Sequence, residues 1–278
     1  MTVAVSARGS EGDASERGFA LLIVLWILVF LALLVTQLTV AWHSEAQIAS
    51  NVRANAMAEA AADGAVYEAV FHLLDRSDRH WGADGVIHQL RSPGSIIRVR
   101  IENEADKVNP NTAPAELLQA LLREVGANAR SAALLAGAIV DWRTPAQTSA
   151  AKRDRAARYQ AAGYTYMPSG APFESIGELR DVIGMTPQVL AALRPHLTVY
   201  SNSDPGIGDP VVATALMDAG FGNNNLVINN ASAPLIVSVT AAVSRSDGSR
   251  FIRHAVMSVS PGGRGHPVRF LTWEEPDD

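Results

Sequence analysis

The feature that most constrains the fold of this chain is a long uncharged segment near its N-terminus. No formally charged side chain lies between Arg17 and Glu45. A helix over residues 19–42 would be about 36 Å long at 1.5 Å per residue. That length is enough to cross a hydrocarbon core of about 30 Å. From length alone we predict that this segment is a single-pass membrane anchor.

The charges on either side of the segment predict its orientation. Arg17 precedes it directly, and the first positive residue after it is Arg53. Because positive flanking residues are retained on the cytoplasmic side of a membrane, we expect residues 1–18 in the cytoplasm and the rest of the chain exported. Residues 1–18 are small, polar and rich in glycine and serine, so no folded unit is expected there.

The composition argues against several classes of function. The 278 residues carry a net charge of −5, whereas sequence-independent nucleic-acid binding needs clustered Lys and Arg. The chain has no cysteine, which excludes disulfide bonds, thiolate metal sites and a cysteine nucleophile. Its seven histidines form no His-x-x-x-His pair, and no nucleophile elbow is present. We therefore expect no catalytic residues and no cofactor.

Beyond the apolar segment the sequence pattern stays helical. Small and apolar residues recur at helical spacing from Ala49 to Leu73, and no proline occurs before Pro93. The single Gly64 costs about 1 kcal/mol relative to alanine, which is too little to end a helix. We predict one helix over residues 19–74, followed by a polar end at residues 75–79.

Three further segments predict strands. Ile97, Val99 and Ile101 alternate with charged residues, which predicts a half-buried strand over residues 95–102. Residues 235–244 and 250–259 are β-rich and flank a Ser-Asp-Gly-Ser turn, which is typical of a hairpin. A last run at residues 268–273 fits an edge strand.

Short helices are predicted between these strands, at residues 115–124, 129–142, 175–182 and 186–194. Thr112 is expected to cap the first helix. Ser175 and Glu178 form a capping box, and Pro187 stands at a first helical position. Residues 144–172 are predicted to form a long polar loop, and residues 204–210 and 222–225 to form turns. A helical block between β segments indicates an α+β fold with an insertion.

The start of the apolar segment resembles the leader and N-terminal helix of type IV prepilins. In that family a membrane peptidase cuts after the glycine and methylates the new N-terminal phenylalanine. The resemblance implies cleavage between Gly18 and Phe19, with N-methylation of Phe19. Most members carry Glu at the fifth mature position, which here is Ile23.

The missing carboxylate predicts where in a filament this chain would sit. A carboxylate in an apolar helix is costly unless it is paired. In the usual family member it pairs with the N-terminal ammonium of a neighbouring subunit. A chain with Ile23 lacks that link, so it would tolerate a terminal position better than an internal one.

The branch of the family without this Glu is the minor pseudopilin of type II secretion called general secretion pathway protein K. Four further segments of this chain resemble that family in the same order, namely residues 99–113, 138–142, 175–185 and 268–273. The resemblance implies an α+β pseudopilin fold with a long N-terminal helix, a small antiparallel β-sheet and an inserted all-helical domain. The implied parts are a cleaved leader (1–18), a transmembrane and assembly helix (19–75), a first α+β part (76–108), the inserted helical domain (109–200) and a second α+β part (201–278).

The resemblance also implies a non-enzymatic function at the tip of the periplasmic pseudopilus, where the protein would help to export folded proteins across the outer membrane. The implied partners are other minor pseudopilins, the major pseudopilin, the prepilin peptidase, the inner membrane and the secreted proteins, with no nucleic acid. The implied location is the bacterial inner membrane, crossed once, with the C-terminal domain in the periplasm.

Members of this family often bind calcium through acidic residues that follow a helix ending in Asp-Trp. Here Trp142 is followed by Arg143, Thr144 and Pro145, and the nearest acid lies in the basic run 152–158. Calcium prefers six to eight oxygen ligands, and this loop supplies few. We expect Asp141 to cap or solvate a helix end without calcium, and the basic run to form a solvated loop face or, less favoured, a partner contact.

The alternative is a minor pilin of a type IV pilus or of a DNA-uptake system. Residues 108–118 and 133–143 resemble the helix-hairpin-helix repeats of competence DNA receptors. Those hairpins need a Gly-x-Gly turn whose amides meet phosphate. The corresponding turns, residues 125–128 and 183–186, each contain a single glycine. We therefore predict structural helix pairs at these positions.

Overall fold

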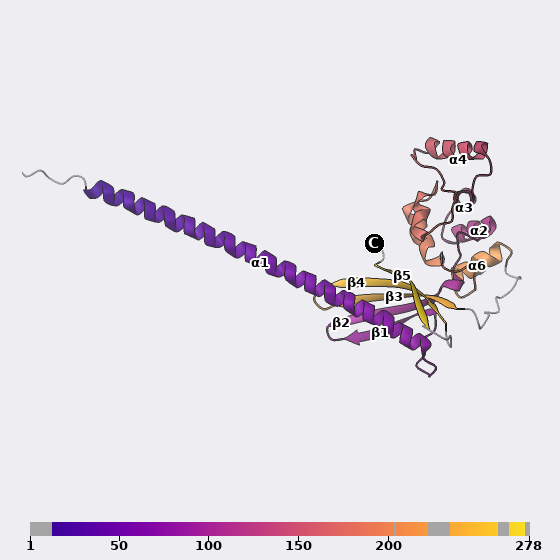
Figure 1. Cartoon of the computed structure of the whole chain (residues 1–278), viewed down its shortest axis with the longest axis horizontal. Helices are drawn as coiled ribbons and strands as arrows, with labels where there is room; N and C mark the ends of the chain where they lie inside the picture. The colour runs from indigo at the N-terminus through magenta and orange to yellow at the C-terminus, as the bar shows by residue number, and fades with distance from the viewer. Residues whose placement is uncertain (1–12, 203, 222–233, 261–266, 276–278) are drawn as a thin grey trace, which may run out of the picture. The chain divides into compact units, whose positions relative to one another are not determined.

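The computed structural model describes residues 13–202, 204–221, 234–260 and 267–275 (Figure 1). In the N-terminal helix, side chains are described at residue 19, at residues 21–34 and from residue 47 onward. The chain divides after Met57 into two compact units, residues 1–57 and 58–278. The predicted turn at residues 222–225 lies outside the described residues.

A single helix, α1 (Asp13–Leu74), extends over 62 residues and confirms the predicted continuity through Gly64. It begins at Asp13, so the predicted start of the helix at residue 19 is wrong by six residues. The physical reason is the lack of a strong helix breaker, since no proline occurs before Pro93 and a single glycine costs only about 1 kcal/mol.

In the first unit, the α1 side chains described at residues 19 and 21–34 form an apolar surface. The large hydrophobic side chains from Phe19 to Leu34 are all exposed, over enough consecutive positions to cover every side of the helix. A helix that is apolar all round belongs in a non-aqueous environment. Among the residues that the structure describes, no helix is both long and apolar enough to span a membrane. The membrane anchor stays a prediction.

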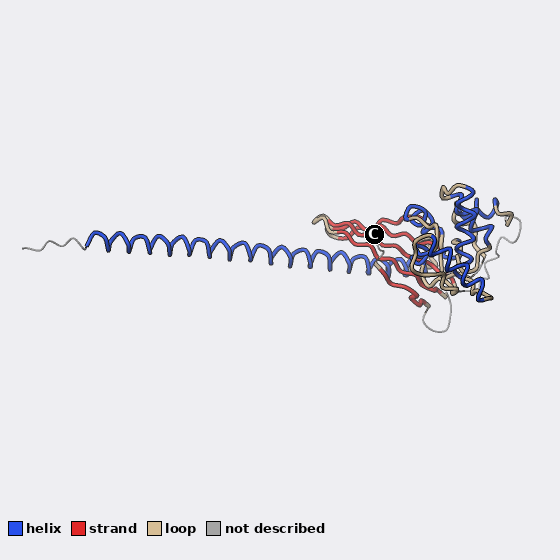
Figure 2. The backbone as a smooth tube through the Cα atoms, turned by 90° about the horizontal axis from the view of Figure 1, so that it is seen from above, coloured by secondary structure: helices blue, strands red, loops and turns tan. Residues whose placement is uncertain are grey.

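The second unit contains one antiparallel sheet with the strand order β1-β2-β3-β4-β5, which Figure 2 shows in red. The strands are β1 (Asp84–Ser92), β2 (Ser95–Asn103), β3 (Leu235–Arg245), β4 (Arg250–Val259) and β5 (Val268–Glu274). Although β2 and β3 are far apart in the sequence, they pair along their whole length. The segment between β2 and β3 therefore leaves the sheet after β2 and re-enters it as the strand directly beside β2. The predicted combination of helices and an antiparallel sheet is confirmed.

The strand predictions hold for β2, for the β3–β4 hairpin and for β5 at the sheet edge. In the hairpin turn Gly248 has φ 89°, the left-handed conformation for which Asp-Gly is suited. The first strand, β1, was not predicted. It lies at the edge of the sheet opposite to β5. Its buried and exposed residues do not alternate regularly, so no local pattern marks the strand, and pairing with β2 stabilises it.

One face of the sheet packs against α1 from Ala58 onward. The strands contribute alternate residues, among them Ile97, Val99 and Ile101, as their spacing predicts. The helix contributes mainly alanine, whose small side chain lets the helix backbone come close to the sheet. The buried helix residues of this core are Ala58, Ala62, Ala65, Val66, Ala69 and Leu73.

A buried arginine joins α1 to β4 within this layer. Arg253 donates from Nε to Asp63 Oδ1 (2.7 Å) and from Nη2 to Glu59 Oε1 (2.8 Å). Its guanidinium also lies over the rings of Phe251 (4.9 Å) and Trp273 (5.6 Å). Because planar guanidinium groups both pair with carboxylates and stack on aromatic faces, this one side chain holds helix and strand together.

The chain between β2 and β3 forms a second hydrophobic core from short helices, drawn in blue in Figure 2. The elements, with η for a 3₁₀-helix, are η1 (Glu104–Asp106), α2 (Ala115–Glu124), α3 (Ala129–Arg143), α4 (Ser149–Ala161), η2 (Ile176–Asp181), α5 (Pro187–Leu193), η3 (Arg194–His196) and α6 (Pro210–Asp218). The predictions of α2, α3 and α5 are confirmed. The predicted capping box is present, but the helix that it opens is a 3₁₀-helix.

Two predictions in this region are wrong, and one helix was not predicted. The predicted loop at residues 144–172 contains α4, of which only Tyr159 is buried, so no apolar periodicity marks the helix. Thr112 does not cap α2, whose N-cap position is Pro114 without a side-chain bond. The short helix α6 was not predicted, because it has only nine residues and directly follows turn-forming glycine and proline.

The chain enters and leaves the α2–η3 part of the helical region at one point. Val108 and Leu197 form a parallel bridge, in which Val108 N donates to His196 O (2.9 Å) and Thr198 N donates to Val108 O (3.0 Å). The second core also includes Val212 and Ala215 of α6, beyond residue 200. The limits predicted for the domains stay a prediction.

Candidate functional site

The predicted processing residues lie near the start of α1. Gly18 and Phe19 are consecutive on the helix, and Ile23 lies one turn after Phe19 on the same side. Phe19 is 67% exposed and Ile23 is 45% exposed. The position that usually carries a carboxylate is therefore an exposed apolar one. Cleavage between Gly18 and Phe19 stays a prediction.

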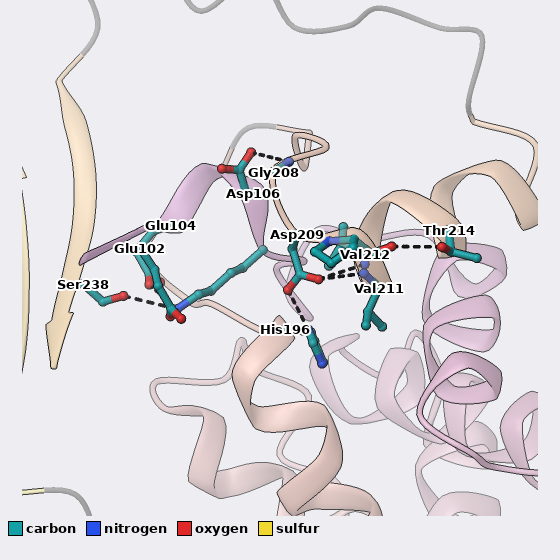
Figure 3. A network of polar contacts seen from close by, with 12 residues as sticks. Glu102, Glu104, Asp106, His196, Gly208, Asp209, Val211, Val212, Thr214 and Ser238 are labelled. Carbon is teal, nitrogen blue, oxygen red and sulfur yellow. Dashed lines mark hydrogen bonds and ion pairs between the residues drawn. The ribbon is translucent and has the colours of Figure 1, made fainter. Parts of the chain in front are cut away.

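A buried ionic cluster lies where β2 leads into the helical region (Figure 3). Lys107 Nζ lies 2.7 Å from Glu104 Oε1, 3.1 Å from Glu102 Oε2 and 3.2 Å from Ser238 Oγ. The side chains of Lys107 and Glu104 are only 10% and 3% exposed. Each of the three ammonium protons therefore has an acceptor. Burial lowers the pKa of Lys107, but Glu104 and Glu102 outweigh burial, so the pKa is raised and the side chain is charged.

The neighbouring Asp106 holds the loop that leads into α6. Its Oδ1 accepts a hydrogen bond from Gly208 N (3.2 Å), and Gly206 N donates to Ala105 O (2.8 Å). A Cβ atom on Gly206 or Gly208 would lie 2.2 or 2.3 Å from an oxygen of the Asp106 carboxylate. A side chain at either position would therefore displace the Asp106 carboxylate from this place.

Asp209 joins the same loop to two helices (Figure 3). Its Oδ1 accepts from Val211 N (2.8 Å) and Val212 N (3.2 Å) at the start of α6. Its Oδ2 lies 2.6 Å from His196 Nδ1 in η3. The carboxylates of residues 102–106 and Asp209 thus connect the sheet to both ends of the helical region.

Two asparagines complete this connection. Asn109 is buried, donates to Ser201 O (2.8 Å) and accepts from Asn111 N (2.8 Å). Asn111 donates to Phe173 O (2.9 Å) and accepts from Phe173 N (2.7 Å). The amide of Asn111 therefore pairs with a backbone as a β-strand would. Sequence analysis included these asparagines only within the resembling segment 99–113 and assigned them no contact.

His254 lies on β4 beside the ionic cluster. Its Nδ1 is 3.1 Å from Thr240 Oγ1. Burial lowers the pKa of His254 and the Lys107 charge lowers it further, while the nearby glutamates Glu104 and Glu102 oppose this effect. The imidazole is therefore neutral in the folded protein at neutral pH.

We expect acid to destabilise the protein partly through His254. Its folded-state pKa lies below the unfolded value of 6.5, so the unfolded chain takes up the proton first and stability falls as the pH drops through about 6.5. In denaturant unfolding from pH 7.5 to 5, wild type should lose stability more steeply than His254→Gln, by up to about 1.4 kcal/mol per pH unit. His80→Gln, which changes an exposed histidine outside the cluster, is the matched control. Parallel curves for wild type and His254→Gln would contradict the prediction.

An exposed aromatic surface covers part of α1 and the edge strand β5. Tyr67 lies 5.8 Å from Phe270 and 5.6 Å from Trp273, measured between ring centroids. Tyr67, Phe71 and Phe270 are exposed. Contiguous exposed aromatic side chains are typical of protein–protein contact surfaces.

The turns of the predicted helix pairs use their amides within the chain. At the end of α2, Gly126 has φ 98°, Gly126 N donates to Arg123 O (3.0 Å) and Ala127 N donates to Leu122 O (2.9 Å). Asn128 then caps α3 by accepting from Ser131 N (2.9 Å). These hydrogen bonds provide partners for the last carbonyls of α2. Because the amides of Gly126 and Ala127 are engaged in them, these two amides do not form a phosphate site.

The predicted basic run lies on α4, where two of its members contact Asp141. Arg155 Nη2 lies 3.3 Å from Asp141 Oδ1, and Arg158 Nη2 lies 2.9 Å from Asp141 Oδ2. Asp141 therefore lies at a helix end and is paired with basic side chains. The basic run forms a helix and not a loop, but its residues 152–154 and Arg158 are exposed as expected, whereas Arg155 is largely covered. In the described part of the chain, no three His, Asp or Glu side chains converge as metal ligands. The donor set at the end of α3 does not fit calcium.

Comparison with known proteins gives a family match for part of the chain. Residues 96–202 match the family model for type II secretion system (T2SS), protein K. The chain is similar to protein K over these residues. A search of curated protein sequences gave no match.

The fold is also similar to a solved structure. One chain in the crystal structure of the GspK–GspI–GspJ complex from the type 2 secretion system of enterotoxigenic Escherichia coli is 13% identical, with a TM-score of 0.56. The similarity covers 84% of this chain and 100% of that chain. At this identity the likeness concerns the fold. The matched family segment contains β2, the ionic cluster from Glu102 to Lys107 and the helices up to η3.

Sequence reasoning missed the ionic cluster. The available signal was an isolated Lys107 among three acids directly after a strand. Its partner Ser238 lies 131 residues away, so no local pattern could assign the pairing.

Proposed function

We propose that this chain is a minor pseudopilin of the type II secretion system, processed between Gly18 and Phe19 and assembled through α1 into a periplasmic pseudopilus. The observation that carries the proposal is the apolar exposed surface of α1 directly after the Gly18–Phe19 junction, in a chain whose residues 96–202 match the protein K family model. Such a surface needs lipid or neighbouring apolar helices around it.

The proposed position is the tip of the pseudopilus. An internal subunit of a prepilin-type filament uses the carboxylate at its fifth mature position to pair with a neighbouring N-terminus. Ile23 offers no such acceptor, and it is exposed on α1. The subunit would therefore end a row of subunits, with the helical region making the tip bulky. Its function is non-enzymatic and supports the export of folded proteins across the outer membrane.

The proposed partners are other minor pseudopilins, with contacts to the major pseudopilin and processing by the prepilin peptidase. The similar solved chain comes from a complex that contains GspK, GspI and GspJ. The aromatic surface of Tyr67, Phe71 and Phe270 provides an exposed area suited to such contacts. The proposed location is the inner membrane, with α1 as the anchor and the second unit in the periplasm.

N-terminal mass analysis of the membrane-extracted protein tests this proposal. We expect a mature chain that starts at Phe19 and carries one additional methyl group on its N-terminus. A chain that retains residues 1–18 would overturn the assignment. Co-purification with the other minor pseudopilins of the same secretion system is the second expected result.

The alternative of a DNA-uptake pilin has less support. It needs free turn amides to meet phosphate, and the amides of Gly126 and Ala127 are engaged within the chain. Low-salt titration of the full-length protein with a DNA duplex separates the two, because sub-micromolar binding would favour the alternative.

A further inference from the structure

A group of oxygen atoms converges where α3 ends and faces α4. The group consists of the Asp141 carboxylate, the Asp141 carbonyl and the Thr144 carbonyl. The last carbonyls of an α-helix lack intrahelical partners, and the partial negative charge at this end favours a cation. We call this place, where the end of α3 faces α4, the α3–α4 corner. Its oxygen atoms carry full or partial negative charge and therefore attract a cation.

One guanidinium contacts all of these groups. Arg155 Nη1 donates to Asp141 O (2.9 Å) and to Thr144 O (2.5 Å), and its Nη2 lies 3.3 Å from Asp141 Oδ1. The Arg155 side chain is only 16% exposed. The second carboxylate oxygen is taken by Arg158 Nη2 at 2.9 Å, from a more exposed side chain. Both oxygens of the single carboxylate are thus already paired.

A second arginine at the end of α3 also donates to two backbone carbonyls. Arg143, the last residue of α3, donates from Nη2 to Ala113 O (2.7 Å) and from Nη1 to Pro110 O. The two guanidinium groups together cross-link the segment before α2, the end of α3 and α4. Arginine suits this role because its planar fork presents several fixed donors and stays charged.

We propose that Arg155 serves as the built-in cation of the α3–α4 corner and makes the helical region independent of divalent cations. A calcium ion would need to displace the guanidinium from the same oxygens and would be repelled by its charge. The corner also offers one carboxylate, whereas calcium sites combine six to eight oxygens. This inference concerns the folding of the helical region and does not depend on the proposed secretion function.

The first test uses the unmodified full-length protein in detergent. Thermal unfolding is followed by near-ultraviolet circular dichroism in EDTA and in millimolar CaCl₂. We expect the same Tm in both. A calcium site with a Kd about a hundredfold below the added concentration would instead raise Tm by about 5–10 °C. Such a rise, or calcium binding in isothermal titration that Asp141→Asn abolishes, would overturn the proposal.

The second test removes the guanidinium. Arg155→Ala should lower Tm by about 4–8 °C, equally in EDTA and in CaCl₂. Arg153→Ala is the matched control, because Arg153 is an exposed neighbour on α4 for which the described part of the chain shows no side-chain partner. If Arg155→Ala and Arg153→Ala unfold at the same temperature, Arg155 does not hold the corner.

Discussion

Replacing Gly18 with leucine is expected to leave residues 1–18 on the chain and to abolish secretion through the pathway that this protein serves. In the prepilin family the peptidase accepts glycine on the leader side of the cut, and leucine adds a bulky side chain at that position. Unprocessed subunits keep a polar leader in front of the apolar surface that starts at Phe19. The effect on assembly should therefore be close to complete.

The measurement is the intact mass of the membrane-extracted protein, together with the amount of exported protein in the medium. Gly9→Leu is the matched control, because it makes the same change within the leader but away from the junction. It should be processed like wild type. Normal processing of Gly18→Leu would show that Gly18–Phe19 is not the cleavage site, even if the family assignment stands.

Replacing Lys107 with alanine is expected to destabilise the second unit by about 3–5 kcal/mol, because it leaves a buried carboxylate without its counter-charge. Glu104 is 3% exposed, and Lys107 is its ion-pair partner at 2.7 Å. At this size of protein the loss corresponds to a Tm lower by roughly 6–20 °C. Thermal and denaturant unfolding of the full-length protein in detergent would measure it.

Two further variants make this test specific. Arg100→Ala removes an exposed ion pair with Glu102, which should change stability by less than about 1 kcal/mol. The double variant Lys107→Met with Glu104→Leu removes both charges and should recover most of the loss, since apolar replacements of buried pairs are often neutral. If Lys107→Ala behaves like Arg100→Ala, the buried pair does not stabilise the connection between sheet and helices.

Local chemistry explains why many elements were predictable. The helix α2 has both an apolar stripe, with Leu117, Leu118 and Leu121 buried, and residues at its ends that stop it. The β3–β4 hairpin has Asp-Gly at its turn, and Gly248 adopts the positive φ that this pair favours. In both cases the signal and the structure lie within the same few residues.

The elements that sequence reasoning missed depend on distant partners. The helix α4 buries little besides Tyr159, and Arg155 and Arg158 attach it to Asp141 across an intervening loop. The strand β1 exists because β2 offers it a pairing edge. Neither element has an apolar periodicity that predicts a helix or a strand. From the sequence pattern alone, α4 is therefore predicted as a loop and β1 is not predicted.

The sequence by itself determined the long apolar helix, the strands β2 to β5, the helices α2, α3 and α5 and the absence of a carboxylate at Ile23, because these follow from neighbouring residues. The junction at Gly18–Phe19 is a prediction of the same local kind. Only the tertiary structure decided how the helical region is attached and what neutralises its charges. Lys107 meets Ser238, Asn109 meets Ser201 and Asp106 meets Gly208 across gaps of 92 to 131 residues. Burial strengthens the pairings of Lys107 and Asn109, and burial is a property of the folded chain rather than of any local segment.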